Sequence, residues 1–157
     1  ARILLYGGSM GASTVMMAAG DPRLPRNVVA AIAESGYTSA RSEFIDAARG
    51  MFHLPRAIAA ACVDAAGLVC KYRAGYDFAD ASCVHSLKHA VIPMLFIHGG
   101  DDHMVSPRFL NANYAACSSL DRTKLLVPGA DHMESSAVDP ETYWHAYEGF
   151  VKRIFKL

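Results

Sequence analysis

A serine flanked by glycines stands near the beginning of the chain, in Gly7-Gly8-Ser9-Met10-Gly11. The apolar run 3–6 before it favours a strand, and a helical pattern follows it. A sharp turn between a strand and a helix exposes the hydroxyl of a serine at its apex, close to the positive end of the helix. Side chains at Gly7 and Gly11 are expected to collide with the neighbouring strand and helix. The pattern therefore indicates a nucleophile at Ser9, with a structural glycine-rich turn as the alternative.

A nucleophilic serine needs a base that takes its proton and an acid that orients the base. Further along the chain, acidic and histidine side chains follow apolar, strand-like runs: Glu34, Asp101, Asp102, His103, Asp131 and His132. Because the carboxyl ends of parallel strands open onto one crevice, we expect these side chains to gather near Ser9. The order Ser, Asp, His along the chain differs from the order in the two common types of serine protease.

Apolar runs and helical periodicity alternate along the 157 residues. This alternation predicts an α/β fold in which a parallel sheet of about four strands is covered by helices on both faces. The strands are expected at 2–6, 28–33, 94–98 and 124–127. No linker or repeat divides the sequence, which predicts a single domain over 1–157. Within it, 38–82 forms a helical, cap-like excursion with expected helices at 40–52 and 55–72.

Four segments resemble the C-terminal half of α/β-hydrolase-fold serine hydrolases, in particular bacterial esterase-like and acyl-peptidase-like members: YGGSMGAST, ESGYTSARSEF, VIPMLFIHGGDDHMVSP and LLVPGADHMES. The resemblance covers essentially the whole chain, in register with strands five to eight of that fold. It implies that Ser9 is the nucleophile, that Asp102 in the HGxxD-like segment is the acid, and that His132 is the base. It also places an oxyanion-hole amide at Met10. The implied activity is hydrolysis of a carboxylic ester or related acyl bond, without a cofactor or a metal.

The resemblance also implies that strands one to four, and the loop that supplies a second oxyanion amide, are not in this sequence. One such donor is commonly worth about 10²–10³ in rate, so we expect a weak or inactive catalyst. The strand at 2–6 would then be an open apolar edge. We therefore expect either a piece of a longer protein or a homodimer formed through that edge. The alternative function is a catalytically incompetent half-fold that acts as a self-associating or binding module.

Other roles are open for several of these residues. Asp102 also suits a turn, Glu34 is the second choice for the acid, and Asp101 suits a loop position bonded to nearby backbone. His98 ends an apolar strand and is expected in the core, whereas His103 is expected to line the pocket or face solvent. A metal site is the competing hypothesis for the Asp and His cluster and for the i, i+4 pair His85 and His89, although neither has the HExxH pattern.

The amino-acid composition of the chain bears on which kinds of molecule it binds. Hydrophobic residues make up 52% of the chain, charged residues make up 19%, and the net charge is zero, which gives no indication of a nucleic-acid partner. The four cysteines show no metal-ligand spacing, and we expect most of them to be buried free thiols. The sequence names neither the substrate nor the cellular compartment.

Overall fold

The structure, a computed structural model, describes residues 1–157 and contains one four-stranded parallel sheet. Its strands are β1 (Ile3–Gly8), β2 (Val28–Glu34), β3 (Met94–Gly99) and β4 (Arg122–Val127), and they lie side by side in this order. The α/β class and the four parallel strands predicted from the sequence are confirmed. Each strand covers the expected residues except Arg2 and extends one or two residues beyond them.

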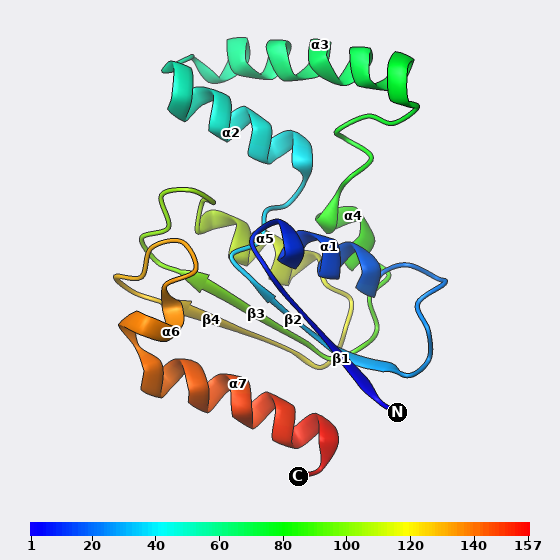
Figure 1. Ribbon diagram of the computed structural model, residues 1–157, viewed down its shortest axis with the longest axis vertical. Coiled ribbons are helices and arrows are strands. Elements are labelled where there is room, and N and C mark those ends of the chain that lie inside the picture. Colours follow the sequence, from blue (N-terminus) through cyan, green and yellow to red (C-terminus); the bar gives the residue numbers. More distant parts are fainter.

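Helices cover both faces of the sheet, as predicted (Figure 1). On one face lie α1 (Met10–Ala19), α4 (Cys83–Leu87) and α5 (Arg108–Ala116). On the other face lies α7 (Pro140–Phe155), preceded by the short helix α6 (Ser135–Val138). None of the helices combines the length and the hydrophobicity that crossing a membrane requires.

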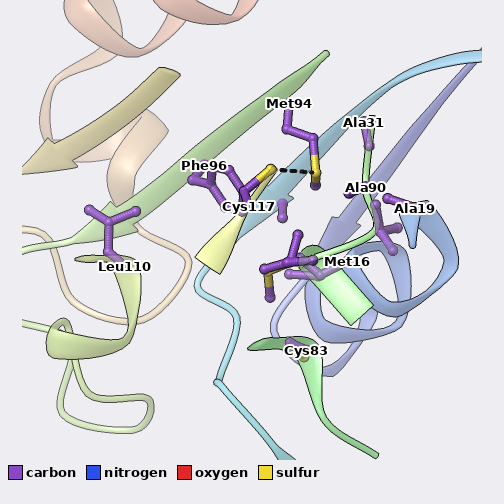
Figure 2. Close-up of a cluster of buried hydrophobic side chains, with 13 residues drawn as sticks. Met16, Ala19, Ala31, Cys83, Ala90, Met94, Phe96, Leu110 and Cys117 are labelled. Atoms are coloured by element: carbon purple, nitrogen blue, oxygen red, sulfur yellow. Dashed lines mark hydrogen bonds between the residues drawn. The ribbon is translucent and has the colours of Figure 1, made fainter. Parts of the chain in front are cut away.

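Strand β2 shows how the alternating side chains of a strand build two cores. Ala31 and Ala33 face α1, α4 and α5, where they pack with Met16, Phe96 and other apolar side chains (Figure 2). Ala30 and Ile32 face α7 on the opposite side, where Phe150 and Ile154 are buried. The small alanine side chains let helices approach β2 closely on both faces.

The excursion between β2 and β3 forms a hairpin of two helices, α2 (Ala40–Phe52) and α3 (Arg56–Ala74), which projects beyond the α1, α4 and α5 layer (Figure 1). Its own small core consists of Ile45, Ala59 and Val63. The chain enters and leaves the hairpin at one place, because Ser39 and Ser82 form an isolated antiparallel bridge. This pairing closes residues 38–82 into a compact unit, and its role as a cap stays a prediction.

The cysteines are all free thiols, but only half of them are buried. Cys83 and Cys117 lie in the core under α1 and α5, as expected, and burial raises the pKa of Cys83 to about 11. The expectation is wrong for Cys62, which is exposed, and for Cys70, which is partly exposed. Both lie on α3, a helix that packs mainly against α2 and leaves much of its surface in solvent.

Strand β1 is an edge of the sheet, because it pairs with β2 alone. Ile3 and Tyr6 on this strand are exposed large hydrophobic residues. An unpaired strand edge can accept another strand through its backbone groups. Pairing of this edge with a second copy of the chain stays a prediction.

The two glycines that flank the serine motif differ in what surrounds them. A Cβ atom at Gly7 would lie 2.8 Å from the amide nitrogen of Ala12 and closer still to the carbonyl group of Gly11. Gly7 therefore lets the end of β1 touch the first turn of α1. The expected collision at Gly11 is wrong, because a Cβ atom there would have no neighbour within 4 Å. Gly11 lies inside the first turn of α1, where its carbonyl lies close to Gly7 but the position of its missing side chain faces open space.

This difference predicts opposite effects for one substitution at two positions. Gly7→Ala should lower the free energy of unfolding by roughly 1–3 kcal/mol, because backbone atoms of α1 must move. Gly11→Ala should raise it by about 0.5–1 kcal/mol, because alanine favours a helix over glycine. Urea denaturation of both variants and the parent chain measures the two effects. Equal destabilisation by the two substitutions would contradict this description of the turn.

A buried carboxyl group joins β2 to α7. The Oε2 atom of Glu34 accepts hydrogen bonds from the phenol groups of Tyr6 and Tyr143, both at 2.9 Å. Burial, together with the negative charge of Glu34, raises the pKa of both phenols, that of Tyr6 to about 12. Both tyrosines therefore remain protonated donors throughout the physiological pH range. The pair compensates Glu34 for the water that it loses by burial.

Removing one of these donors should destabilise the fold. Tyr143→Phe is expected to lower the free energy of unfolding by about 1–3 kcal/mol, because Glu34 loses the buried one of its two tyrosine donors. Tyr147→Phe is the matched control on the same helix, since the hydroxyl group of Tyr147 has no hydrogen-bond partner in the protein and its removal should change stability little. Thermal and urea unfolding would compare the two variants, and equal losses would argue against a special role for the Glu34 contact.

Candidate active site

Ser9 lies at the apex of a strained turn between β1 and α1. Its backbone dihedral angles are φ 54° and ψ −121°, a conformation that residues with a side chain rarely adopt. Hydrogen bonds hold the turn on both sides: the Ser9 amide donates to the carbonyl of Glu34 at 2.8 Å, and the Ser9 carbonyl accepts from Ala12 at 3.0 Å. The end of β2 and the first turn of α1 thus fix the position of the serine hydroxyl.

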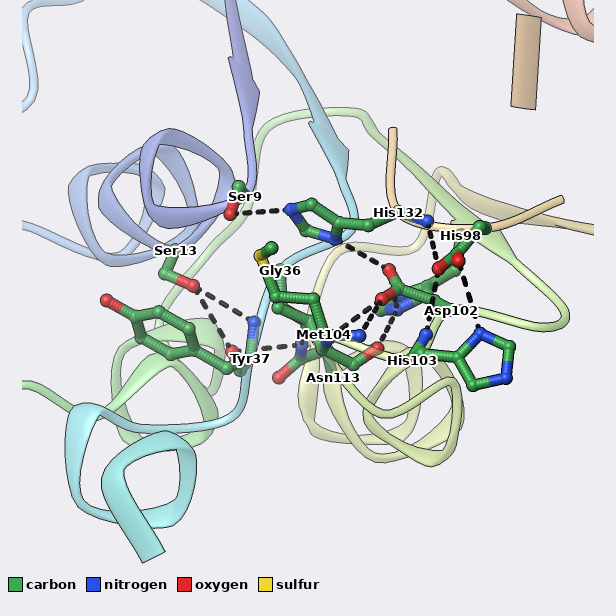
Figure 3. Close-up of polar contacts among 12 residues, drawn as sticks. Ser9, Ser13, Gly36, Tyr37, His98, Asp102, His103, Met104, Asn113 and His132 are labelled. Carbon is green, nitrogen blue, oxygen red and sulfur yellow. Dashed lines mark hydrogen bonds and ion pairs between the residues drawn. The ribbon is translucent and has the colours of Figure 1, made fainter. Parts of the chain in front are cut away.

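The register of the sheet brings distant loops to this turn. Gly8 at the end of β1 is opposite Glu34, and Gly99 at the end of β3 is opposite Val127 at the end of β4. All four strands therefore end at one edge of the sheet. The loops after β3 and β4 carry Asp102 and His132 to this edge, beside Ser9 (Figure 3).

The three residues form a continuous series of hydrogen bonds. The Nε2 atom of His132 lies 2.9 Å from Oγ of Ser9, and its Nδ1 atom lies 2.8 Å from Oδ2 of Asp102 (Figure 3). With the proton of neutral His132 on Nδ1, Nε2 is free to accept the serine proton. This geometry suits proton transfer from a hydroxyl group to an imidazole held by a carboxylate.

The carboxylate of Asp102 is buried and well supplied with donors. Its Oδ1 atom accepts from the amides of Met104 at 3.0 Å and Val105 at 2.7 Å, while its Oδ2 atom faces His132. The Asp102 side chain has no solvent exposure. The side chain of Asp102 therefore closes a turn, one of the roles expected from the sequence, and also contacts the histidine, while its role as the acid stays a prediction.

His98 occupies the core beneath Asp102, as expected from the sequence. Its Nε2 atom lies 2.9 Å from the carbonyl oxygen of Val105 and 3.3 Å from Oδ2 of Asp102. Burial lowers the pKa of His98, which keeps the ring neutral. A neutral His98 donates its Nε2 hydrogen to this loop and does not form an ion pair that would compete with His132 for Asp102.

Asp131 has a positioning contact that sequence reasoning missed. Its Oδ1 atom accepts from the backbone amides of His103 at 2.9 Å and His132 at 2.7 Å. These two hydrogen bonds join the loop after β3 to the loop after β4, and they lower the pKa of Asp131. The chain position of Asp131, immediately before the histidine, gives no signal that its partner lies 28 residues earlier.

The remaining sequence candidates lie apart from the hydrogen-bonded series. Glu34 is engaged by its two tyrosines, and the exposed side chain of Asp101 accepts no hydrogen bond, although its amide donates to Ala130. The exposed ring of His103 faces Asp131 at 3.2 Å. His85 and His89 pack edge to face, and no three His, Cys, Asp or Glu side chains are grouped as metal ligands.

A small apolar cavity adjoins Ser9. It has a volume of about 220 Å³ and is lined by Ser9, Met10, Tyr37, Ala40, Glu43, Phe44, Met104 and Val105. Its walls come from α1, from the loop after β2, from the first turn of α2 and from the loop after β3. Met10 is the first residue of α1, so its amide has no acceptor within the helix and points out of the helix beside Ser9.

The Tyr37 wall of the cavity is fixed by a second polar network that the sequence did not indicate. The amide of Tyr37 donates to Oγ of Ser13 at 3.1 Å, and Nδ2 of Asn113 donates to the carbonyl of Tyr37 at 3.2 Å (Figure 3). Ser13 and Asn113 are both buried. Helices α1 and α5 therefore hold the loop after β2 in place from two sides.

Comparison with solved structures identifies the fold. An esterase of Pyrococcus furiosus matches with a TM-score of 0.68 and 18% identity over 98% of this chain and 54% of its own. An acylaminoacyl peptidase of Pyrococcus horikoshii matches with a TM-score of 0.68 and 16% identity over 98% of this chain and 24% of its own. A Mycobacterium tuberculosis protein named as a non-heme bromoperoxidase matches with a TM-score of 0.61 and 18% identity, over 98% of this chain and 68% of its own.

No protein-family model matches the sequence, and no curated protein sequence matches it. The chain spans about half the length of the Pyrococcus furiosus esterase. The names of the matched structures cover more than one reaction, so the fold by itself does not select the chemistry. The shared architecture, over nearly the whole chain, shows that this protein has the α/β-hydrolase fold.

Proposed function

We propose that this chain carries the catalytic residues of a serine hydrolase that cleaves carboxylic esters or related acyl bonds. The observation that supports this most is the series of short contacts from Ser9 through His132 to Asp102, 2.9 Å and 2.8 Å long. The matched esterase and acylaminoacyl peptidase, as named, act on acyl compounds, and this agrees with the proposed reaction.

In the proposed reaction, Oγ of Ser9 attacks the carbonyl carbon of the ester while Nε2 of His132 takes the hydroxyl proton. The Nδ1 hydrogen of His132 stays bonded to Asp102, which stabilises the imidazolium. The Met10 amide donates to the oxyanion that develops on the carbonyl oxygen. His132 then protonates the departing alcohol. A water molecule, losing a proton to His132, finally releases the acid and restores Ser9.

The number of hydrogen-bond donors to the oxyanion determines the turnover rate that we expect for this chain. Met10 provides one amide, and a second donor commonly contributes about 10²–10³ in rate. We therefore expect slow turnover, and we base the first test on a covalent reaction of the serine, which needs only one event per molecule.

A fluorophosphonate probe should label the chain at Ser9. Ser9→Ala should abolish the labelling, because the nucleophile is gone, while the exposed Ser118→Ala, far from this site, should label like the parent. Mass spectrometry of the labelled peptide identifies the modified residue. Labelling that survives in Ser9→Ala would refute the role of Ser9. A folded chain that no probe labels would favour the alternative of a binding module without catalysis.

A pair of isosteric substitutions should separate the two candidate acids. Asp102→Asn is expected to lower the rate of labelling, and any turnover of 4-nitrophenyl butanoate, by roughly 10³- to 10⁴-fold, because the amide no longer stabilises the imidazolium. Glu34→Gln should change both rates by less than about tenfold, because Glu34 contacts tyrosines and not His132. The reverse order of effects would transfer the acid role to Glu34. Circular dichroism would verify that both variants fold.

A further inference from the structure

Glu43 is an acidic residue in the wall of the Ser9 cavity that the proposed reaction does not use. It lies in the first turn of α2, and six of the seven other residues that line the cavity are hydrophobic. Its Oε2 atom is buried and has no hydrogen-bond partner in the protein. A buried carboxyl oxygen without a donor is costly, and its presence calls for an explanation.

Support of helix α2 does not account for this position. An acidic side chain in the first turn does stabilise a helix, but this effect does not require a carboxyl oxygen to be buried without a donor. The cap of α2 is already complete, because Ser39 and Ser42 bond each other's backbone amides. Glu43 nevertheless keeps a buried carboxyl oxygen without a donor in the wall of the largely apolar cavity beside Ser9, and helix capping does not explain this.

The charges around Glu43 leave it without a cation of its own. Asp46, one turn further along α2, forms ion pairs with Arg49, Arg56 and Arg108. Burial, then the negative charges of Asp46 and Asp102, raise the pKa of Glu43 to about 7, against the opposing effects of His132 and Arg108. Groups from α2, from α5 and from the loops after β3 and β4 therefore surround Glu43 without making a hydrogen bond to its Oε2 atom.

We propose that Glu43 determines substrate specificity by accepting a hydrogen bond from a cationic group, such as an ammonium, on the ester bound at Ser9. This proposal rests on the proposed hydrolase function. A bound cation would supply both the donor and the positive charge that Glu43 lacks. The cavity volume of about 220 Å³ is below the roughly 300–1,000 Å³ of pockets for drug-sized ligands, so the preferred substrate part is short.

Matched neutral and cationic esters test the proposal. In the acyl arm, 4-nitrophenyl 3-aminopropanoate is compared with 4-nitrophenyl butanoate, in which a methyl group replaces the ammonium. In the alcohol arm, 2-(dimethylamino)ethyl acetate is compared with 3-methylbutyl acetate. The quantity measured is the ratio of kcat/KM for the cationic ester to kcat/KM for the neutral one. Intrinsic reactivity cancels when this ratio is compared between the parent chain and a variant.

Glu43→Gln should lower this ratio by about tenfold to hundredfold in one of the two arms, because a hydrogen bond between charged groups is lost. The arm that responds shows whether the cavity holds the acyl or the alcohol part. Glu148→Gln is the matched control, because it removes the same charge from an exposed position on α7. It should leave the ratio unchanged. An unchanged ratio for Glu43→Gln in both arms would overturn the proposal.

The pH dependence gives a second readout that a structural role would not produce. Below about pH 7 Glu43 is mostly protonated and neutral, and above it the ionised form can attract a cation. The ratio should therefore rise with pH through about 7 in the parent and stay flat in Glu43→Gln. A parent ratio that does not change between about pH 5.5 and 8 would contradict the proposal.

A binding experiment covers the case in which turnover is too slow to measure. Boronic acids add to an active serine, so 3-aminopropylboronic acid and butylboronic acid are compared by isothermal calorimetry. Glu43→Gln should reduce the preference for the amino compound by about tenfold or more. Binding that does not change in Ser9→Ala would overturn the proposed function. Binding that depends on Ser9 but shows the same preference in Glu43→Gln would overturn the role of Glu43 alone.

Stability measurements separate specificity from folding. The pKa of Glu43 is higher in the folded chain than the ordinary value of a glutamate, so its ionisation above about pH 7 opposes folding. Glu43→Gln removes that cost and should melt at the same or a higher temperature at pH 8. A lower melting temperature at that pH would indicate that Glu43 supports the fold, contrary to the proposal.

Discussion

The geometry of the site depends on the buried carboxylate of Asp102. A carboxylate without solvent contact is stable only when donors surround it, and here two backbone amides and the ring of His132 do so. The amides belong to the turn that Asp102 itself begins, so the requirement for donors shapes the loop after β3. The same requirement aligns the imidazole of His132, which then faces Ser9. One desolvated group thus couples the ends of β3 and β4 to the end of β1.

The strain at Ser9 is a cost that the surrounding structure must offset. A residue held in such a conformation costs on the order of 1–3 kcal/mol. The amide of Ser9 is bonded to β2 and its carbonyl to α1, so relaxation of the turn would break contacts with both elements. Gly7 also helps to hold Ser9 in this conformation, because only a glycine lets the first turn of α1 lie against the end of β1. The serine is therefore held in position before any substrate arrives.

The sequence alone allowed the four strands, the main helices and the three residues of the hydrogen-bonded series to be predicted. Ser9 and several acidic and histidine side chains follow apolar strand-like runs, and parallel strands end at a common edge, so local patterns placed this group together. The resemblance to the hydrolase family then selected Asp102 and His132 within the group. Local patterns could not show that Asp131 joins two loops, or that Ser13 and Asn113 fix Tyr37. These contacts depend on the angles at which loops and helices leave the sheet.

The surroundings of glycine and cysteine residues show the same limit. Gly7 and Gly11 are equivalent in the motif, but only Gly7 faces another element, because the helix turns Gly11 away. Cys62 and Cys83 both lie in helical segments, yet α3 packs mainly against α2, whereas α4 lies against α1 and the sheet. Burial of a small residue is decided by the tertiary neighbour, which a single sequence does not specify.

On the proposed mechanism, Glu43 and the oxyanion share one cavity, and their charges oppose each other. An ionised Glu43 near the Met10 amide would raise the energy of negative charge on the carbonyl oxygen, most strongly where apolar walls exclude water. The raised pKa of Glu43 limits this effect near neutral pH by keeping part of the population uncharged. A cationic group on the substrate would cancel the remaining charge at the moment when the oxyanion forms. A cationic ester would then be preferred both in binding and in the transition state, since the same cation neutralises Glu43 and favours the oxyanion.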